Sequence, residues 1–136
     1  MINDRRPGLS RFAVVFSILM WAAVSASAAE PDPNFHLYLL IGQSNMAGRG
    51  KVDDESKKTD SRVVMLTKDL KWAPATDPLH FDKSAAGVGP GLAFGKMMAD
   101  SNPKVKIGLV PCAVGGTSIR VWVPGAPDKA TNTHPY

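Results

Sequence analysis

The chain is poor in cysteine, with Cys112 as the one thiol among its 136 residues. A lone cysteine excludes an intrachain disulfide, and no cluster of cysteine and histidine has the spacing of a zinc site. The neighbours of Cys112 are apolar, which raises a thiol pKa and predicts a structural residue rather than a nucleophile. Because the acidic run 53–55 lies in a lysine-rich stretch typical of a solvated surface, we expect neither a metal nor a cofactor.

The sequence also lacks a concentrated basic stripe, although its formal net charge is +4. Three arginines fall within the first eleven residues, and the lysines beyond them are scattered along the chain. A nucleic-acid-binding protein gathers its positive charge on one face or along one element. We therefore expect no nucleic-acid partner, and the composition leaves the oligomeric state open.

The N-terminal segment has the pattern of a secretory signal peptide over residues 1–28. Arg5, Arg6 and Arg11 precede an apolar run over 12–24, and the small residues Ala26-Ser27-Ala28 follow it. This run is short for a membrane span, although an uncleaved anchor is the alternative. We expect cleavage near Ala28, export to the periplasm or the outside, and one domain over residues 29–136 with no membrane span after cleavage.

Beyond residue 29, strand and helix patterns alternate. The apolar run 36–41 predicts a strand buried on both faces, and 62–66 and 104–110 predict two further strands. A helical spacing of apolar residues covers 91–100, whereas 51–61 and 69–83 are expected to be irregular. Strands separated by helical segments favour a parallel α/β sheet, in which functional residues gather at the carboxyl ends of the strands.

The stretch Ile41-Gly-Gln-Ser-Asn-Met-Ala-Gly-Arg-Gly50 follows the first predicted strand and presents Ser44 on a glycine-rich turn. Two interpretations stay open from the residues alone. Ser44 could be the N-cap of a helix, although a capping box would place Glu or Gln where Ala47 stands. It could instead be a nucleophile at a strand end, although Met46 stands where the G-x-S-x-G elbow needs glycine.

Four blocks, taken in order, resemble the sialate O-acetylesterase domain family of carbohydrate esterases, which are relatives of the SGNH hydrolases. They are Leu40-Ile-Gly-Gln-Ser-Asn-Met-Ala-Gly48, Gly87-Val-Gly-Pro-Gly-Leu-Ala-Phe94, Ile107-Gly-Leu-Val-Pro111 and Ala113-Val-Gly-Gly-Thr-Ser-Ile119 followed by Trp122. The resemblance implies a three-layer, flavodoxin-like α/β fold with a parallel sheet, and an enzyme that removes O-acetyl groups from carbohydrates.

The resemblance also assigns roles to particular residues. Ser44 matches the nucleophile, and its own N–H would be one donor to the oxyanion. Gly115 or Gly116 would supply the next donor, and the residues alone do not separate them, although we favour Gly116. Gln43 and Asn45 are expected to support the turn through their amides.

One departure from the family pattern concerns the catalytic base. In the family, a carboxylate and a histidine in a later block supply it, and this chain ends at Tyr136 before such a block. We therefore expect an incomplete sheet and weak activity, with a non-catalytic carbohydrate-binding remnant or an inactive fragment as alternatives. The spacing of Asp77 and His80 matches the family's acid–base pair, but its place between the other blocks disfavours that role. Trp72 and Trp122 are candidates for stacking on sugars.

Overall fold

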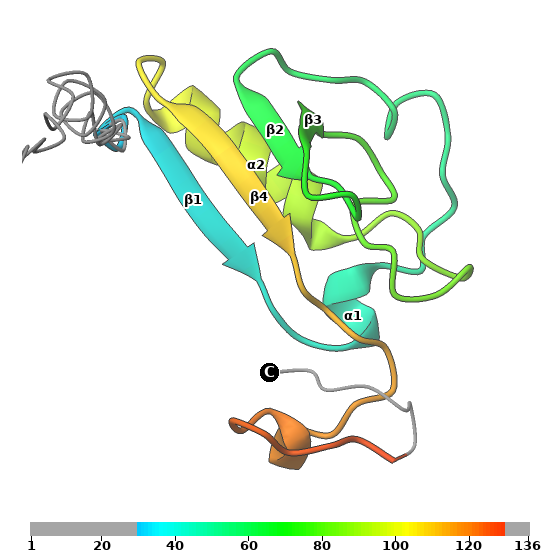
Figure 1. Ribbon diagram of the computed structural model, residues 1–136. Helices are drawn as coiled ribbons and strands as arrows, with labels where there is room; N and C mark the ends of the chain where they lie inside the picture. The colour runs from blue at the N-terminus through cyan, green and yellow to red at the C-terminus, as the bar shows by residue number, and fades with distance from the viewer. Residues whose placement is uncertain (1–29, 130–136) are drawn as a thin grey trace, which may run out of the picture. The chain divides into compact units, whose positions relative to one another are not determined.

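The computed structural model describes residues 30–129 (Figure 1). The predicted signal segment lies outside the described residues, and so does His134, one of the three histidines of the chain. The elements are β1 (Phe35–Leu40), α1 (Ser44–Ala47), β2 (Val63–Leu66), β3 (Trp72–Pro74), α2 (Pro90–Ser101), β4 (Lys106–Pro111) and the short 3₁₀ helix η1 (Ile119–Val121). Within this range, no helix has the length and apolar character that crossing a membrane requires.

The four strands form one mixed sheet in the order β1-β4-β2-β3. β4 lies between β1 and β2 and runs parallel to both, with Leu109 opposite Tyr38 on one side and Met65 on the other. β3 is antiparallel to β2, so the expectation of a purely parallel sheet is wrong at this edge. β3 also falls in the stretch expected to be irregular. It includes Pro74, which is tolerated because an edge strand needs no N–H on its open side.

α2 covers one face of the sheet and completes the main core (Figure 1). Val63, Ile107 and Leu109 are fully buried on this face, where Gly95 of α2 lies against Leu109 and Val63. The helix begins with Pro90 at its first position, where the missing N–H removes no helical hydrogen bond. Each buried aliphatic side chain contributes roughly 1.5–3 kcal/mol, so this single helix fixes the sheet that carries the candidate site.

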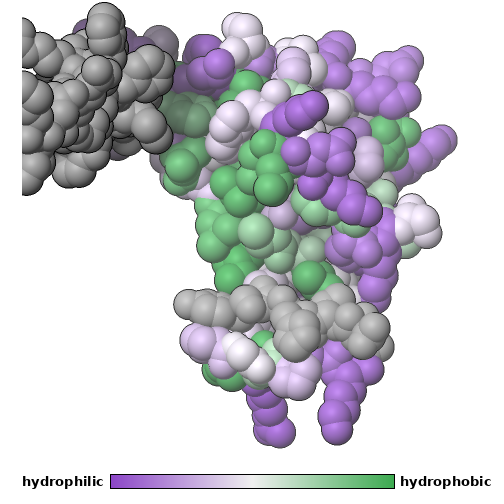
Figure 2. Space-filling model, viewed as in Figure 1, coloured by the Kyte–Doolittle hydropathy of each residue, from purple (hydrophilic) through white to green (hydrophobic). Residues whose placement is uncertain are grey.

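The opposite face of β1 is exposed, so the expected burial on both faces is wrong. Leu37 and Leu39 are 59% and 58% exposed, and Figure 2 shows apolar side chains gathered where β1 crosses this face. The physical reason is that α2 packs against the other face of the sheet. β1 also lies at an edge of the sheet.

A pair of glycine-rich loops lies between α1 and α2, and we call residues 48–50 and 87–89 the glycine bridge. Gly50 and Val88 exchange both backbone hydrogen bonds, at 3.0 and 2.9 Å, and the Gly87 N–H donates to the Gly48 carbonyl at 3.2 Å. The two backbones approach so closely that a Cβ on Gly48 would lie 2.5 Å from the Gly87 oxygen. The bridge therefore holds the turn after Ser44 against the start of α2.

Candidate active site

Ser44 is the first residue of α1 and follows the turn that ends β1. The N-cap position belongs to Gln43, so the structure does not place Ser44 as the helix cap. Ser44 is half-buried as a residue. Its hydroxyl donates to Gln43 Oε1 at 2.8 Å, and its N–H donates to the same oxygen at 3.1 Å. Gln43 Oε1 thus accepts hydrogen bonds from both the hydroxyl of Ser44, which would attack a substrate, and its N–H, which would stabilise the oxyanion. The side chain of Asn45 is exposed.

The turn after β4 lies beside the turn after β1. Backbone pairing continues past the ends of these strands, since Cys112 donates to the Leu40 carbonyl at 3.0 Å and Val114 to the Gly42 carbonyl at 2.9 Å. Ser44 lies two residues beyond Gly42, and Gly116 lies two residues beyond Val114. The structure therefore brings the two turns to neighbouring places at the carboxyl edge of the sheet.

The two glycines of the second turn differ in what their N–H groups do. The Gly115 N–H donates to Asp82 Oδ2 at 2.8 Å, so it is already engaged. The Gly116 N–H has no hydrogen-bond partner among residues 30–129. Gly116 also has a φ of +89°, which a residue with a side chain rarely adopts. The geometry therefore favours Gly116 as the donor that a ligand could use.

A cavity of about 320 Å³ adjoins both turns. Its lining is largely apolar and consists of Ile41, Gly42, Gln43, Thr117, Ile119 and Trp122. The Trp122 indole N–H donates to Thr117 Oγ1 at 3.0 Å, and the Thr117 hydroxyl donates to the Val114 carbonyl at 2.7 Å. Trp122 is therefore held at the site. Trp72 does not line this cavity, and its ring packs edge-to-face on Phe35 instead.

Asp77 and His80, the pair with the family's acid–base spacing, are buried and hold backbone groups. The Asp77 carboxyl accepts hydrogen bonds from the N–H groups of Gly89 and Leu79, and burial nevertheless raises its pKa. His80 Nδ1 accepts the Ala113 N–H at 3.3 Å, so the ring carries its proton on Nε2. His36 is exposed on β1. Within residues 30–129, no histidine or carboxylate forms a hydrogen bond with Ser44.

Acidification is expected to destabilise the fold through His80. Burial holds the pKa of His80 below its ordinary value of 6.5, with Asp82 opposing and Arg49 reinforcing the shift. Below about pH 6.5 the unfolded chain therefore binds a proton that the folded chain does not, and the free energy of unfolding falls as the pH drops. We expect the melting temperature to fall between about pH 7.5 and about pH 5.5.

The variant His80→Asn provides the control for this expectation, because its side-chain oxygen can still accept the Ala113 N–H but does not titrate. Its melting temperature should fall less than that of the wild type over the same pH interval. Equal losses in the two proteins would show that another group carries the pH dependence.

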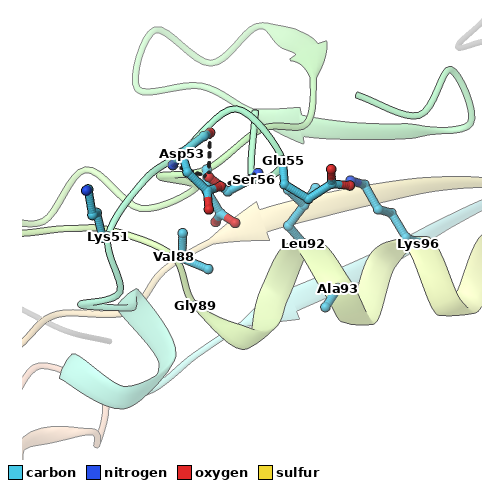
Figure 3. A pocket seen from close by; sticks show the side chains of 10 residues that line it. Lys51, Asp53, Glu55, Ser56, Val88, Gly89, Leu92, Ala93 and Lys96 are labelled. Carbon is cyan, nitrogen blue, oxygen red and sulfur yellow. Dashed lines mark hydrogen bonds between the residues drawn. The ribbon is translucent and has the colours of Figure 1, made fainter. Parts of the chain in front are cut away.

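A second cavity, of about 350 Å³, lies apart from these turns (Figure 3). It is formed mainly by the loop 51–56 and the first turns of α2. Asp77 lines it, whereas Gln43, Ser44 and the two glycines of the second turn do not. The carboxylate of Asp53 is engaged within that loop, where it accepts the Ser56 N–H at 2.9 Å. The described residues contain no group of three or more His, Cys, Asp or Glu side chains placed to hold a metal ion.

Cys112 lies at the base of the second turn and is half-buried. Burial raises the pKa of its thiol above the ordinary value, which disfavours the reactive thiolate.

Three residues near the site were missed by sequence reasoning, namely Arg49, Asp82 and Lys83. They contact the backbone of the two turns from exposed or irregular segments, and no spacing in the sequence marks them.

A mostly parallel sheet covered by a helix, with a serine turn at its carboxyl edge, is consistent with an α/β hydrolase-like fold. A family model described as carbohydrate esterase, sialic acid-specific acetylesterase, matches residues 34–136. The chain belongs to this family, as the resemblance predicted.

Two comparisons with individual proteins agree with this assignment. A protein of Arabidopsis thaliana named probable carbohydrate esterase is 37% identical, over 71% of this chain and 44% of the plant protein. The X-ray structure of an Arabidopsis thaliana protein aligns with a TM-score of 0.61 and 38% identity, over 70% of this chain and 46% of that chain. The chain thus spans less than half the length of each of these proteins.

Proposed function

We propose that the chain acts as a serine esterase that removes O-acetyl groups from carbohydrates through an acyl-enzyme on Ser44. The observation that carries this proposal is the hydrogen bond between Val114 and Gly42, which sets the serine turn beside the Gly116 turn. Membership of the carbohydrate esterase family supports the substrate class. The cavity lined by Trp122 and by Gln43, the neighbour of Ser44 in sequence, offers an apolar wall for the acetylated sugar.

In the proposed reaction, Ser44 Oγ attacks the acetyl carbonyl carbon and gives up its proton to a base. The carbonyl electrons move onto oxygen, where the N–H groups of Ser44 and Gly116 stabilise the charge. Collapse of this intermediate breaks the bond to the sugar oxygen, which leaves as an alcohol after taking up a proton. Water then attacks the acetyl-serine and releases acetate.

Two features of the site define what must happen before attack. The Ser44 N–H is bonded to Gln43 Oε1, so the substrate carbonyl oxygen has to replace the glutamine oxygen. No histidine or carboxylate of residues 30–129 forms a hydrogen bond with Ser44, so we propose that the base is supplied from outside this range. Gln43 is exposed, and the two hydrogen bonds to Ser44 are what its side chain would give up.

The proposal is tested by incubating the chain with 4-nitrophenyl acetate and with acetylated xylo-oligosaccharides. We expect acetate release and an acetyl group on the peptide that contains Ser44, detected by mass spectrometry. A second candidate function, carbohydrate binding without catalysis, is favoured by the absence of a base beside Ser44 among the described residues. Binding of the oligosaccharides by calorimetry, without acetyl-serine, would support that function instead.

We further propose that the chain is exported and that its complete fold is the three-layer type of the SGNH hydrolases. Export is supported by the basic, apolar and small-residue segments within residues 1–28. Expression with the native N-terminus should give a product outside the cytoplasm that begins near residue 29. Retention of the full N-terminus in the cytoplasm would contradict it.

A further inference from the structure

Three side chains from residues 80–83 hold the backbone of the second turn. His80 accepts the Ala113 N–H at 3.3 Å, and Asp82 accepts the Gly115 N–H at 2.8 Å. The Lys83 ammonium donates to the Gly115 carbonyl at 2.6 Å. Asp82 and Lys83 therefore form hydrogen bonds with both the N–H and the C=O of Gly115. We call this pair of residues the 82–83 clamp.

Asp82 is itself held in place from the other turn. Its side chain is 2% exposed, and Arg49 Nη2 lies 3.3 Å from the carboxylate oxygen that accepts the Gly115 N–H. Arg49 Nη1 donates to the Gly48 carbonyl at 2.6 Å, at the end of α1. Burial alone would raise the pKa of Asp82, but the Gly115 N–H and the Arg49 guanidinium outweigh it and lower the pKa. Through Arg49, the 82–83 clamp is thus connected to the end of α1, the helix that begins with Ser44.

Lys83 has a direct geometric relation to the Gly116 N–H. The carbonyl of Gly115 and the N–H of Gly116 belong to one planar trans peptide unit, so they point in opposite directions in one plane. Fixing the carbonyl oxygen therefore fixes the direction of the Gly116 N–H. A cation bonded to the carbonyl also polarises the peptide, which makes the N–H a stronger donor.

We propose that Lys83 is a positioning residue of the esterase, which aims the Gly116 N–H at the oxyanion through the Gly115 carbonyl, with Asp82 anchoring the same glycine. This inference rests on the proposed esterase function. It assigns Lys83 no contact with the substrate. The role is expressed in the transition state, because the oxyanion needs a preorganised donor more than the ground-state carbonyl does.

The test compares Lys83→Met, Lys83→Arg and the control Lys57→Met, an exposed lysine in the loop 51–61. Removing one oxyanion donor outright costs about 10²–10³-fold in kcat, so a misdirected donor should cost roughly ten- to a hundredfold. We expect Lys83→Met to lower kcat for 4-nitrophenyl acetate to this extent with KM unchanged. Lys83→Arg keeps a donor for the Gly115 carbonyl and should retain most of the activity.

A second measurement detects the effect of Lys83 on the Gly116 N–H directly, without an activity assay. In ¹⁵N-labelled chain, the Gly116 amide signal should move in Lys83→Met and stay in Lys57→Met, while the melting temperature of both stays near the wild-type value. An unmoved Gly116 signal overturns the proposal, and so does a moved signal with unchanged kcat. If the wild type shows no Ser44-dependent turnover, the esterase function fails, and the Gly116 signal still shows whether the clamp itself exists.

Discussion

Replacing Ser44 by alanine is expected to eliminate the acetyl-enzyme and to lower acetyl ester hydrolysis by at least about 10³-fold. The expectation follows because Ser44 Oγ supplies the bond to the acyl group. Removing the nucleophilic serine of a complete triad costs on the order of 10⁶ in kcat, and the loss is smaller here because no base is hydrogen-bonded to Ser44 among residues 30–129. Hydrolysis of 4-nitrophenyl acetate and mass spectrometry of the labelled peptide measure the two effects. The fold should survive, because the side chain is half-buried and bonds only to its neighbour Gln43 among the described residues.

The matched control is Ser61→Ala, which removes an exposed hydroxyl in the turn before β2. Its hydrolysis rate and melting temperature should equal those of the wild type. If Ser44→Ala retained hydrolysis and acetyl labelling appeared elsewhere, another residue would be the nucleophile. The same outcome would leave the family membership intact, because that rests on the whole of residues 34–136.

Replacing Gly48 by alanine is expected to lower the free energy of unfolding by at least about 3 kcal/mol. The new Cβ would lie 2.5 Å from the carbonyl oxygens of Gly87 and Val88 and 2.6 Å from the Gly89 nitrogen. These are backbone atoms, so no side chain can rotate away to make room. Gly48 also has a φ of +81°, which strains any residue with a Cβ. Denaturant unfolding monitored by circular dichroism measures the loss.

Gly125→Ala is the control for Gly48→Ala, because Gly125 has a similar φ of +74° and nothing within 4 Å of a Cβ. It should cost only the backbone contribution, about 1–2 kcal/mol. The difference between the two variants isolates the close contact in the glycine bridge. Equal losses would mean that the two loops can separate without cost, and the bridge would then not fix the position of Ser44.

Periodicity identified the elements that carry the core. The apolar runs at 36–41 and 104–110 and the helical spacing at 91–100 correspond to β1, β4 and α2. β3 was missed because three residues, one of them Pro74, show no strand pattern, and pairing with β2 supplies the hydrogen bonds that local sequence does not indicate. The exposure of Leu37 could not be predicted, because it depends on which face of the sheet α2 covers.

For the site, the resemblance supplied the roles of Ser44 and the two glycines, and these roles stay predictions. What the sequence could not show is which glycine N–H is engaged, because the answer depends on Asp82, 33 residues away in an irregular segment. Nor does it show that Gln43 Oε1 holds both the Ser44 hydroxyl and its N–H. Which nearby N–H or O–H groups a side-chain oxygen accepts from depends on the geometry of the turn, and the residue type alone does not determine this.

The strand order also constrains when the chain can fold during synthesis. β1 pairs with β4, and Phe35 lies opposite Lys106 in this pairing. The two strands can therefore pair only after Lys106 has been translated. β2 and β3 are close in sequence and can form a hairpin early, but the central strand arrives last. A nascent chain would therefore leave the ribosome tunnel with the backbone of β1 unpaired and accessible to chaperones. Such late completion suits a polypeptide that is threaded unfolded through a translocation channel, as the proposed export would require.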